Sequence, residues 1–205
     1  YVAVAIGSPE PIGLGLAHAA RPISVPAIVT ESDGDVVQCL DGRPAQEVYL
    51  EKLGRADEVM DDDEFGDFAA VHPLAQPELS GDVRLRHVVA RAPAGGLRSV
   101  THIPANAAVH FTEQTPEDIV VSGGAAVRTA RHALDGRPVR AALVFDCAGR
   151  KHVLGSSLEA EAAAVLEGFG PGSTPVAGVY TRGEIGRVRG AKGDRNHALV
   201  VVALA

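Results

Sequence analysis

The sequence predicts an α+β fold in which a mixed, largely antiparallel sheet packs against helices. The run "VRAALVF" (139–145) is continuously apolar, as expected of a central strand covered on both faces, and "HALVVVALA" (197–205) is similarly apolar. Two segments carry helix-start signals: "TPED" (115–118) offers a cap, a proline and two acids, and "SSLE" (156–159) fits a capping box. Long crossovers and adjacent hairpins coexist, which indicates a mixed sheet.

The first part of the chain reads as strands and one helix. Turn residues in "SDGD" tolerate positive φ and predict a hairpin. After Pro44, apolar residues recur at helical spacing as far as Gly54, which is typical of an amphipathic helix and its end. The expected elements are strands at 1–6, 12–20, 27–31 and 35–40 and a helix over 44–53.

An acidic run, "DEVMDDDEFGD" (57–67), follows that helix. We expect a solvated loop there, which marks a boundary or an insertion. Calcium binding is not favoured, because the run lacks the oxygen-ligand spacing and the central glycine of a known calcium loop.

The second part of the chain alternates strands with helices. The expected elements are strands at 83–90, 97–103, 107–112, 139–145, 175–180 and 197–205 and helices over 116–134 and 157–167. Gly123 and Gly124 weaken the middle of the first of these helices. We expect the strands 139–145 and 197–204 to lie inside a sheet that both helices cover.

Composition narrows the class of protein. The chain has 205 residues, of which 46% are hydrophobic and 22% charged, as is ordinary for a globular protein. Its net charge of −7 argues against a nucleic-acid partner. No secretory signal and no run long enough to span a membrane is evident, so a reducing, cytoplasmic location is expected. The chain opens on "YVAVAIG", an apolar strand without a Met, which we interpret as a chain cut within a domain.

Several short motifs follow one another in an order that carries a resemblance. They are "CLDGRPAQEVYLEKLG" (39–54), "HPLA" (72–75), "DVRLRHVV" (82–89), "ALVFDCAGR" (142–150), "GVYTRGEIG" (178–186) and "NHALVVV" (196–202). In this order they resemble FIST domain proteins, which are intracellular sensory proteins of bacteria with an N-terminal and a C-terminal FIST region. The resemblance assigns residues 36–205 to the C-terminal region and residues 1–35 to the closing strands of the N-terminal one.

The resemblance also implies a function. It implies sensing of a small ligand, with amino acids as the proposed ligands, and transmission to a signalling output protein or domain. It implies no established catalytic residues, so we expect no enzyme, and we assign no cofactor. A pocket shared between the two FIST regions would be incomplete here.

Cys147 ends the strand in "ALVFDCAGR" and admits three interpretations: a nucleophile, a thiol that lines a ligand pocket, or a residue that fills the core. A nucleophile needs a base and electropositive surroundings, which Arg150 favours and Asp146 opposes. Burial is common for cysteine, so packing is a strong alternative. We expect an unpaired, mostly buried thiol close to "GEIG" and no disulfide with Cys39. Zinc binding is not indicated, because the eight histidines show no paired spacing of the zinc type.

The segment "YTRGEIGRVRG" (180–190) supplies candidate ligand-binding residues. Gly183 and Gly186 let the backbone approach a ligand, and Glu184 between them suits an ammonium group. Arg150 or Arg182 would bind a carboxylate. Together with Glu184, either arginine suits the ammonium and carboxylate groups of an amino acid. The alternative is an internal Glu–Arg pair that orders two strand ends.

The predicted pocket lies where strands 139–145 and 175–180 end. Its expected lining is Leu143, Phe145 and Val179, and its expected ligand-binding side chains are those of Cys147, Arg150, Arg182, Glu184 and Asn196. Two other functions remain open. One is a sensor that holds haem through His18 or His197, and the other is an enzyme that uses Cys147.

Overall fold

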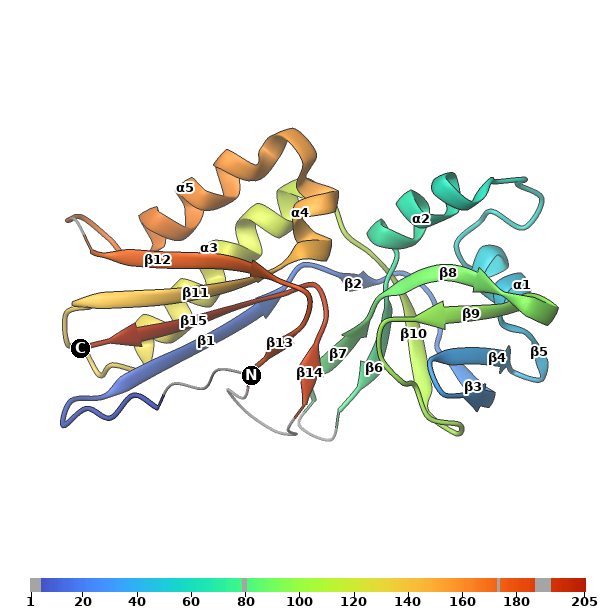
Figure 1. The fold of residues 1–205 in the computed structure, drawn as a ribbon, viewed down its shortest axis with the longest axis horizontal. Helices are drawn as coiled ribbons and strands as arrows, with labels where there is room; N and C mark the ends of the chain where they lie inside the picture. The colour runs from blue at the N-terminus through green and yellow to red at the C-terminus, as the bar shows by residue number, and fades with distance from the viewer. Residues whose placement is uncertain (1–4, 79–80, 173, 187–192) are drawn as a thin grey trace.

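The computed structural model describes residues 5–78, 81–172, 174–186 and 193–205, which form two lobes side by side (Figure 1). One lobe is built on a four-stranded sheet and is called the α/β lobe. The other is built on a nine-stranded sheet and is called the β lobe. Strand pairing is antiparallel throughout except for one pair, so the predicted α+β class with a mixed, largely antiparallel sheet is confirmed.

The sheet of the α/β lobe has the strand order β1-β15-β11-β12, in which β11 and β12 run parallel. Its strands are β1 (Ile12–His18), β11 (Ala141–Cys147), β12 (Val176–Thr181) and β15 (Ala198–Leu204). The two apolar runs occupy the two interior positions, as predicted. β1 pairs along its whole length with β15. The assignment of residues 1–35 and 36–205 to two FIST regions stays a prediction.

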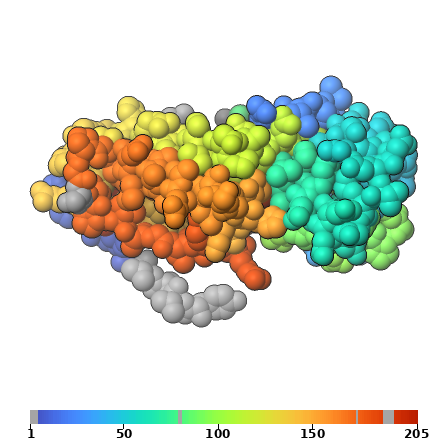
Figure 2. Space-filling model, turned by 90° about the horizontal axis from the view of Figure 1, so that it is seen from above, coloured from blue at the N-terminus to red at the C-terminus, as the bar shows by residue number. Residues whose placement is uncertain are grey.

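Three helices cover one face of this sheet, as Figures 1 and 2 show. They are α3 (Pro116–His132), α4 (Ala148–Leu154) and α5 (Leu158–Gly168). The expected cap is present at α3, where the Thr115 side chain and Asp118 form a capping box. Their apolar side chains form one core with the strands, including Val127, Val144 and Val201.

Glycines let α3 lie unusually close to its neighbours. A Cβ on Gly13 or Gly15 of β1 would clash with the backbone carbonyl oxygens of Ala130 and Ala126 in α3. A Cβ on Gly123 would sit 3.2 Å from Val165 of α5. The glycine that weakens α3 by propensity is therefore the one that lets α5 pack against it.

Replacing Gly15 by alanine should destabilise the protein. The clash is with backbone, which cannot swing aside, so we expect a loss of about 1–3 kcal/mol, as in overpacked cores. Urea denaturation measures it. Gly66→Ala is the matched control, because Gly66 lies in a helix with open space around it and alanine favours helix. An equal midpoint for Gly15→Ala and wild type would contradict the close α3–β1 contact.

The β lobe has the strand order β7-β6-β10-β3-β4-β9-β8, with β2 beside β10 and β5 beside β4. Its elements are β2 (Arg21–Pro22), β3 (Ala27–Asp33), β4 (Val36–Leu40), β5 (Arg43–Pro44), α1 (Ala45–Lys52), α2 (Asp62–Val71), β6 (Leu74–Pro77), β7 (Val83–Arg86), β8 (Val88–Ala92), a short 3-10 turn (Pro93–Gly95), β9 (Gly96–Ser99) and β10 (Ala108–Glu113). Tyr49, Phe65 and Phe111 meet at the centre of its core. The two-stranded pair β13 (Glu184–Ile185) and β14 (Asp194–Arg195) links this lobe to the other.

Three expectations need correction. The acidic run 57–67 is not a loop throughout, because Asp61 caps α2 and forms a capping box with Glu64. Acidic side chains at a helix N-terminus are stabilised by the helix dipole, and this was the missed signal. The strand expected over 83–90 divides at His87, whose N–H donates to Asn196 instead of to a neighbouring strand. Of the strand expected at 1–6, residues 1–4 lie outside the described residues, and residues 5 and 6 are not in a strand.

Among helices α1 to α5, none is both long enough and apolar enough to cross a membrane, in the part of the chain that the structure describes.

Candidate functional site

A pocket of about 490 Å³ lies between α5 and the strands β11 and β12. Its wall is apolar except for three side chains, and the lining residues are Val144, Asp146, Glu161, Ala162, Val165, Leu166, Val176, Gly178, Val179, Tyr180 and Leu199. It is next to the strand ends where the sequence predicts a pocket. Val179 borders it as expected, although its pairing with Phe145 directs its side chain to the other side of the sheet. Leu143 and Phe145 do not border it, because they alternate with Val144 and face the other side of the sheet.

Asp146, Arg150 and Glu161 form a buried charged cluster at the base of the pocket. The Nε of Arg150 is 2.9 Å from Asp146 Oδ1, and its terminal nitrogens bind Glu161, the Ser122 hydroxyl and the Ile119 carbonyl. Arg150 is fully buried. Its two terminal nitrogens donate hydrogen bonds to protein groups, whereas its Nε forms an ion pair with Asp146 without hydrogen-bond geometry. The guanidinium is thus held as a structural ion, and the pocket presents the two carboxyl groups.

The two carboxyl groups are placed to share one proton. Burial, with a contribution from Glu161, raises the pKa of Asp146 to about 8 despite the neighbouring Arg150. Asp146 hydrogen bonds with Glu161, and a bond between two carboxyl groups requires a proton on one of them. Glu161 Oε2 is buried and receives no hydrogen bond from an ordinary N–H or O–H donor in the described residues. A protonated Asp146, which its raised pKa favours, supplies that donor.

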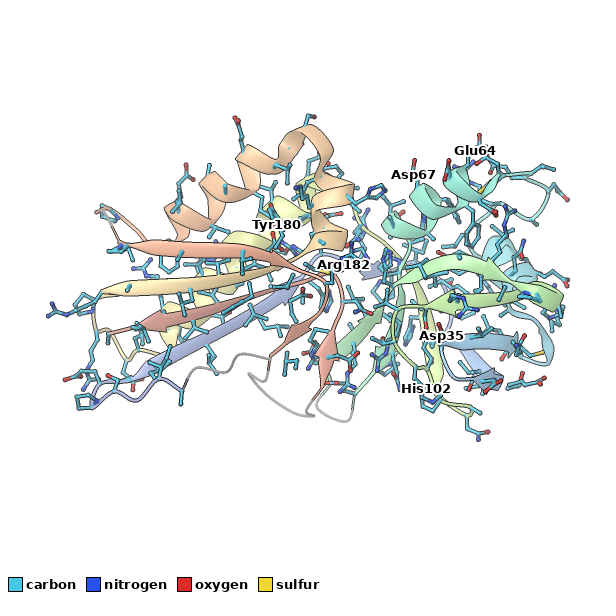
Figure 3. The ribbon with its side chains drawn as sticks, viewed as in Figure 1. Asp35, Glu64, Asp67, His102, Tyr180 and Arg182 are labelled. Carbon is cyan, nitrogen blue, oxygen red and sulfur yellow. The ribbon has the colours of Figure 1, made fainter. Side chains whose placement is uncertain are left out.

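Tyr180 forms the polar rim of the pocket. It projects from β12 on the side of the helices, as Figure 3 shows, and Lys151 Nζ lies 5.4 Å from the centre of its ring. Burial and the nearby carboxyl groups raise the pKa of its hydroxyl to about 12, so it stays protonated and can donate a hydrogen bond. The rim is therefore neutral and aromatic, and the base is acidic.

Cys147 and Glu184 lie together at the end of β11, as the sequence predicts. Cys147 is unpaired and buried, and Cys39 is also unpaired, in the other lobe. Burial and the nearby Glu184 raise the pKa of the Cys147 thiol to about 11. Glu184 accepts a hydrogen bond of 2.5 Å from the Thr181 hydroxyl, and burial raises its pKa as well. These groups bind one another at a strand end, and the raised pKa opposes a reactive thiolate.

Asn196 and His197 lie at the junction between the lobes. Asn196 Oδ1 accepts hydrogen bonds of 3.2 Å from the His87 N–H and the Thr101 hydroxyl, both in the β lobe. Gln114 donates to His197 Nδ1 at 2.8 Å, which leaves the proton on Nε2, bound to His87. Both ring nitrogens of His197 are therefore occupied, and burial lowers its pKa well below the usual value.

The structure thus separates the five predicted ligand-binding residues into four places. Cys147 and Glu184 are in contact, Arg150 lies beneath the pocket, and Asn196 lies between the lobes. Arg182 is exposed at the end of β12 (Figure 3). Their role in binding stays a prediction, and none of them is among the residues that line the pocket.

Sequence reasoning missed Asp146, Glu161 and Tyr180. The signal for Asp146 was its place four residues before Arg150, at the end of an apolar strand. The signal for Glu161 was a charged residue one turn before Val165, on the buried stripe of an otherwise apolar helix. Neither His18 nor His197, considered for haem, lines the pocket. No cluster of three His, Cys, Asp or Glu side chains suited to a metal ion occurs within the described ranges.

Comparisons with known proteins identify the class. The model of the FIST C domain matches residues 45–187, more than half of the chain. Two uncharacterized proteins of Mycobacterium tuberculosis, from strains CDC 1551 / Oshkosh and ATCC 25618 / H37Rv, are each 30% identical over 176 residues. The match covers 83% of this chain and 45% of each relative, so the chain spans about half the length of these curated relatives. No solved structure matches significantly.

The chain belongs to the FIST C domain family, as the sequence motifs indicate. FIST C domains are sensory-type domains. What this member senses has to be argued from its own pocket.

Removing the Arg150 guanidinium should severely destabilise the fold. Arg150→Ala leaves two carboxyl groups buried without their counter-ion, and breaking such a pair costs about 3–5 kcal/mol. Asp146→Asn is the matched control, because it resembles the protonated acid in shape and charge and should cost much less. Chemical denaturation of both variants measures this. Equal losses for the two would contradict a protonated Asp146.

Proposed function

We propose that this domain is a cytoplasmic sensor that binds a small amine with an apolar body in the α5–β12 pocket and passes the signal to an output partner. It binds the ligand without turning it over. The observation that carries the proposal is an apolar pocket that ends on two buried carboxyl groups, those of Asp146 and Glu161. A few fixed polar groups in an apolar wall are typical of small-molecule sites.

The acidic groups at the bottom of the pocket determine which ligands it favours. An ammonium group can take the place of the shared proton, because it donates to both carboxylates and restores their charge balance with Arg150. A zwitterionic amino acid is less suited, since its carboxylate would meet two acidic groups while Arg150 is already bound to protein. The expected ligand is therefore an amine that lacks the carboxylate group of an amino acid.

The wall supports an apolar body of modest size. Val144, Val165 and Leu166 face the space, and Tyr180 adds an aromatic rim that favours a cation or a ring. A volume of about 490 Å³ is within the range of small-ligand pockets. Since β12 is an edge strand and α5 is the other wall, an occupant would bear on both and could alter the surface offered to a partner.

Binding should be tested with three probes of similar shape: phenethylamine, phenylalanine and 2-phenylethanol. We expect the amine to raise the unfolding temperature most, because only it supplies a cation without a carboxylate. Glu161→Gln should weaken amine binding at least tenfold, as expected when a buried charged partner is lost. The control is Glu159→Gln, an exposed carboxylate on the same helix, which should bind as wild type does.

The pH dependence of amine affinity shows whether a proton is released or taken up on binding. Below pH 8 the free protein holds a proton on Asp146, and the ammonium must displace it. Affinity should therefore rise with pH from 6 to 8, by up to about tenfold per unit, and level off above the pKa. Calorimetry in buffers of different ionisation enthalpy should detect about one proton released per amine bound. Tighter binding of phenylalanine than of phenethylamine, or no proton release, would contradict the proposal.

A further inference from the structure

The face of the four-stranded sheet opposite the helices consists of apolar rows. Cross-strand pairing aligns Leu14, Val202, Leu143 and Ala177 in one row across all four strands. The same register places Leu16, Val200, Phe145 and Val179 in the next row. Directly paired residues point to the same side, and the helices contact the alternate rows, which include Ala142, Val144 and Val201. This second side of the sheet is called the open face, defined by the two rows.

The described part of the chain covers the open face at one end only. A Cβ on Gly186 would lie 3.0 Å from Val200, so Gly186, the residue directly after β13, lies close against the second row. Away from that contact Leu14 is 38% exposed and Val179 is 53% exposed, while Leu143 and Val202 are half-buried. In Figure 1 the three helices all lie on the other side of this sheet.

The residue pattern indicates that this face is buried against another apolar surface. In an antiparallel sheet with one solvent-exposed face, apolar and polar residues alternate along each strand. Here β11 and β15 are apolar on both sides, as strands are when both faces of a sheet are covered. An apolar surface of this extent on a globular protein marks an interface.

We propose that the open face is covered, in the full-length protein, by an apolar layer from the same polypeptide outside these 205 residues. The length of the relatives supports this occupant, because more than half of each relative lies outside the matched region. The chain's own segment at Gly186 already begins the cover, so an intramolecular layer would continue it. The α/β lobe is then the outer part of a three-layer arrangement of helices, sheet and added layer.

Cysteine labelling tests the cover in the protein at its full natural length. Leu14→Cys is placed in a Cys39→Ser background, where Cys147 stays unreactive because it is buried and its pKa is raised. The control is Val59→Cys, at a side chain that is 95% exposed in the β lobe. We expect N-ethylmaleimide to modify Leu14→Cys at least tenfold more slowly in the full-length protein than in the 205-residue chain, with Val59→Cys equally fast in both.

Two outcomes would overturn the proposal. One is equal labelling of Leu14→Cys in the two proteins, which would mean that the face is open to solvent. The other is slow labelling in the 205-residue chain itself together with a dimer in sedimentation, which would make a second copy the occupant. Because the substitution could loosen the cover, hydroxyl-radical footprinting of the unsubstituted proteins gives a second measurement. Leu14 and Leu143 should be oxidised less in the full-length protein, and equal oxidation would count against the cover.

Discussion

The α/β lobe depends on one buried cation, Arg150. Its guanidinium joins four elements, since the side chain leaves α4 and binds Asp146 on β11, Glu161 on α5 and the Ser122 hydroxyl and Ile119 carbonyl on α3. A charge in this environment is tolerated only when its hydrogen bonds are complete and its charge is balanced. The positions of α3, α4 and α5 relative to the sheet are therefore fixed by the geometry of a single side chain.

The same constraint determines the chemistry of the pocket. Burial raises the pKa of Asp146, and the neighbouring Glu161 adds to this effect, although Arg150 opposes it. Both carboxyl side chains are buried, which limits their contact with water. A site of this kind favours exchange of one positive charge for another, a proton for an ammonium group. It does not offer a free arginine to an anion.

The sequence was sufficient for the class of fold and for the interior strands, because continuous apolar runs and helix caps are local signals. It also placed Cys147 beside Glu184. A pocket lies near the ends of β11 and β12, but none of the five predicted ligand-binding side chains lines it. The sequence failed to pair the charges. Arg150 was expected to face a ligand, but its partners are 4, 11, 28 and 31 residues away, and only the first spacing is visible in a helix-like pattern.

Other failures have the same origin. Asn196 was expected at a ligand, whereas it binds His87 and Thr101 about a hundred residues away in the β lobe, a contact that no local pattern encodes. The strand 139–145 was predicted to be covered on both faces. In the described residues, helices cover only one face of its sheet. The apolar residues on the second face instead fit the additional layer proposed above.

The shared proton is the central claim, and carbon-13 NMR of labelled aspartate side chains tests it most directly. One carboxyl resonance should titrate near pH 8, far above the ordinary range for aspartate, and it should be absent from the spectrum of Asp146→Asn. Addition of a bound amine should shift that titration to lower pH. A spectrum in which every aspartate titrates below about pH 5 would contradict a protonated Asp146, and with it the proposed basis of ligand selection.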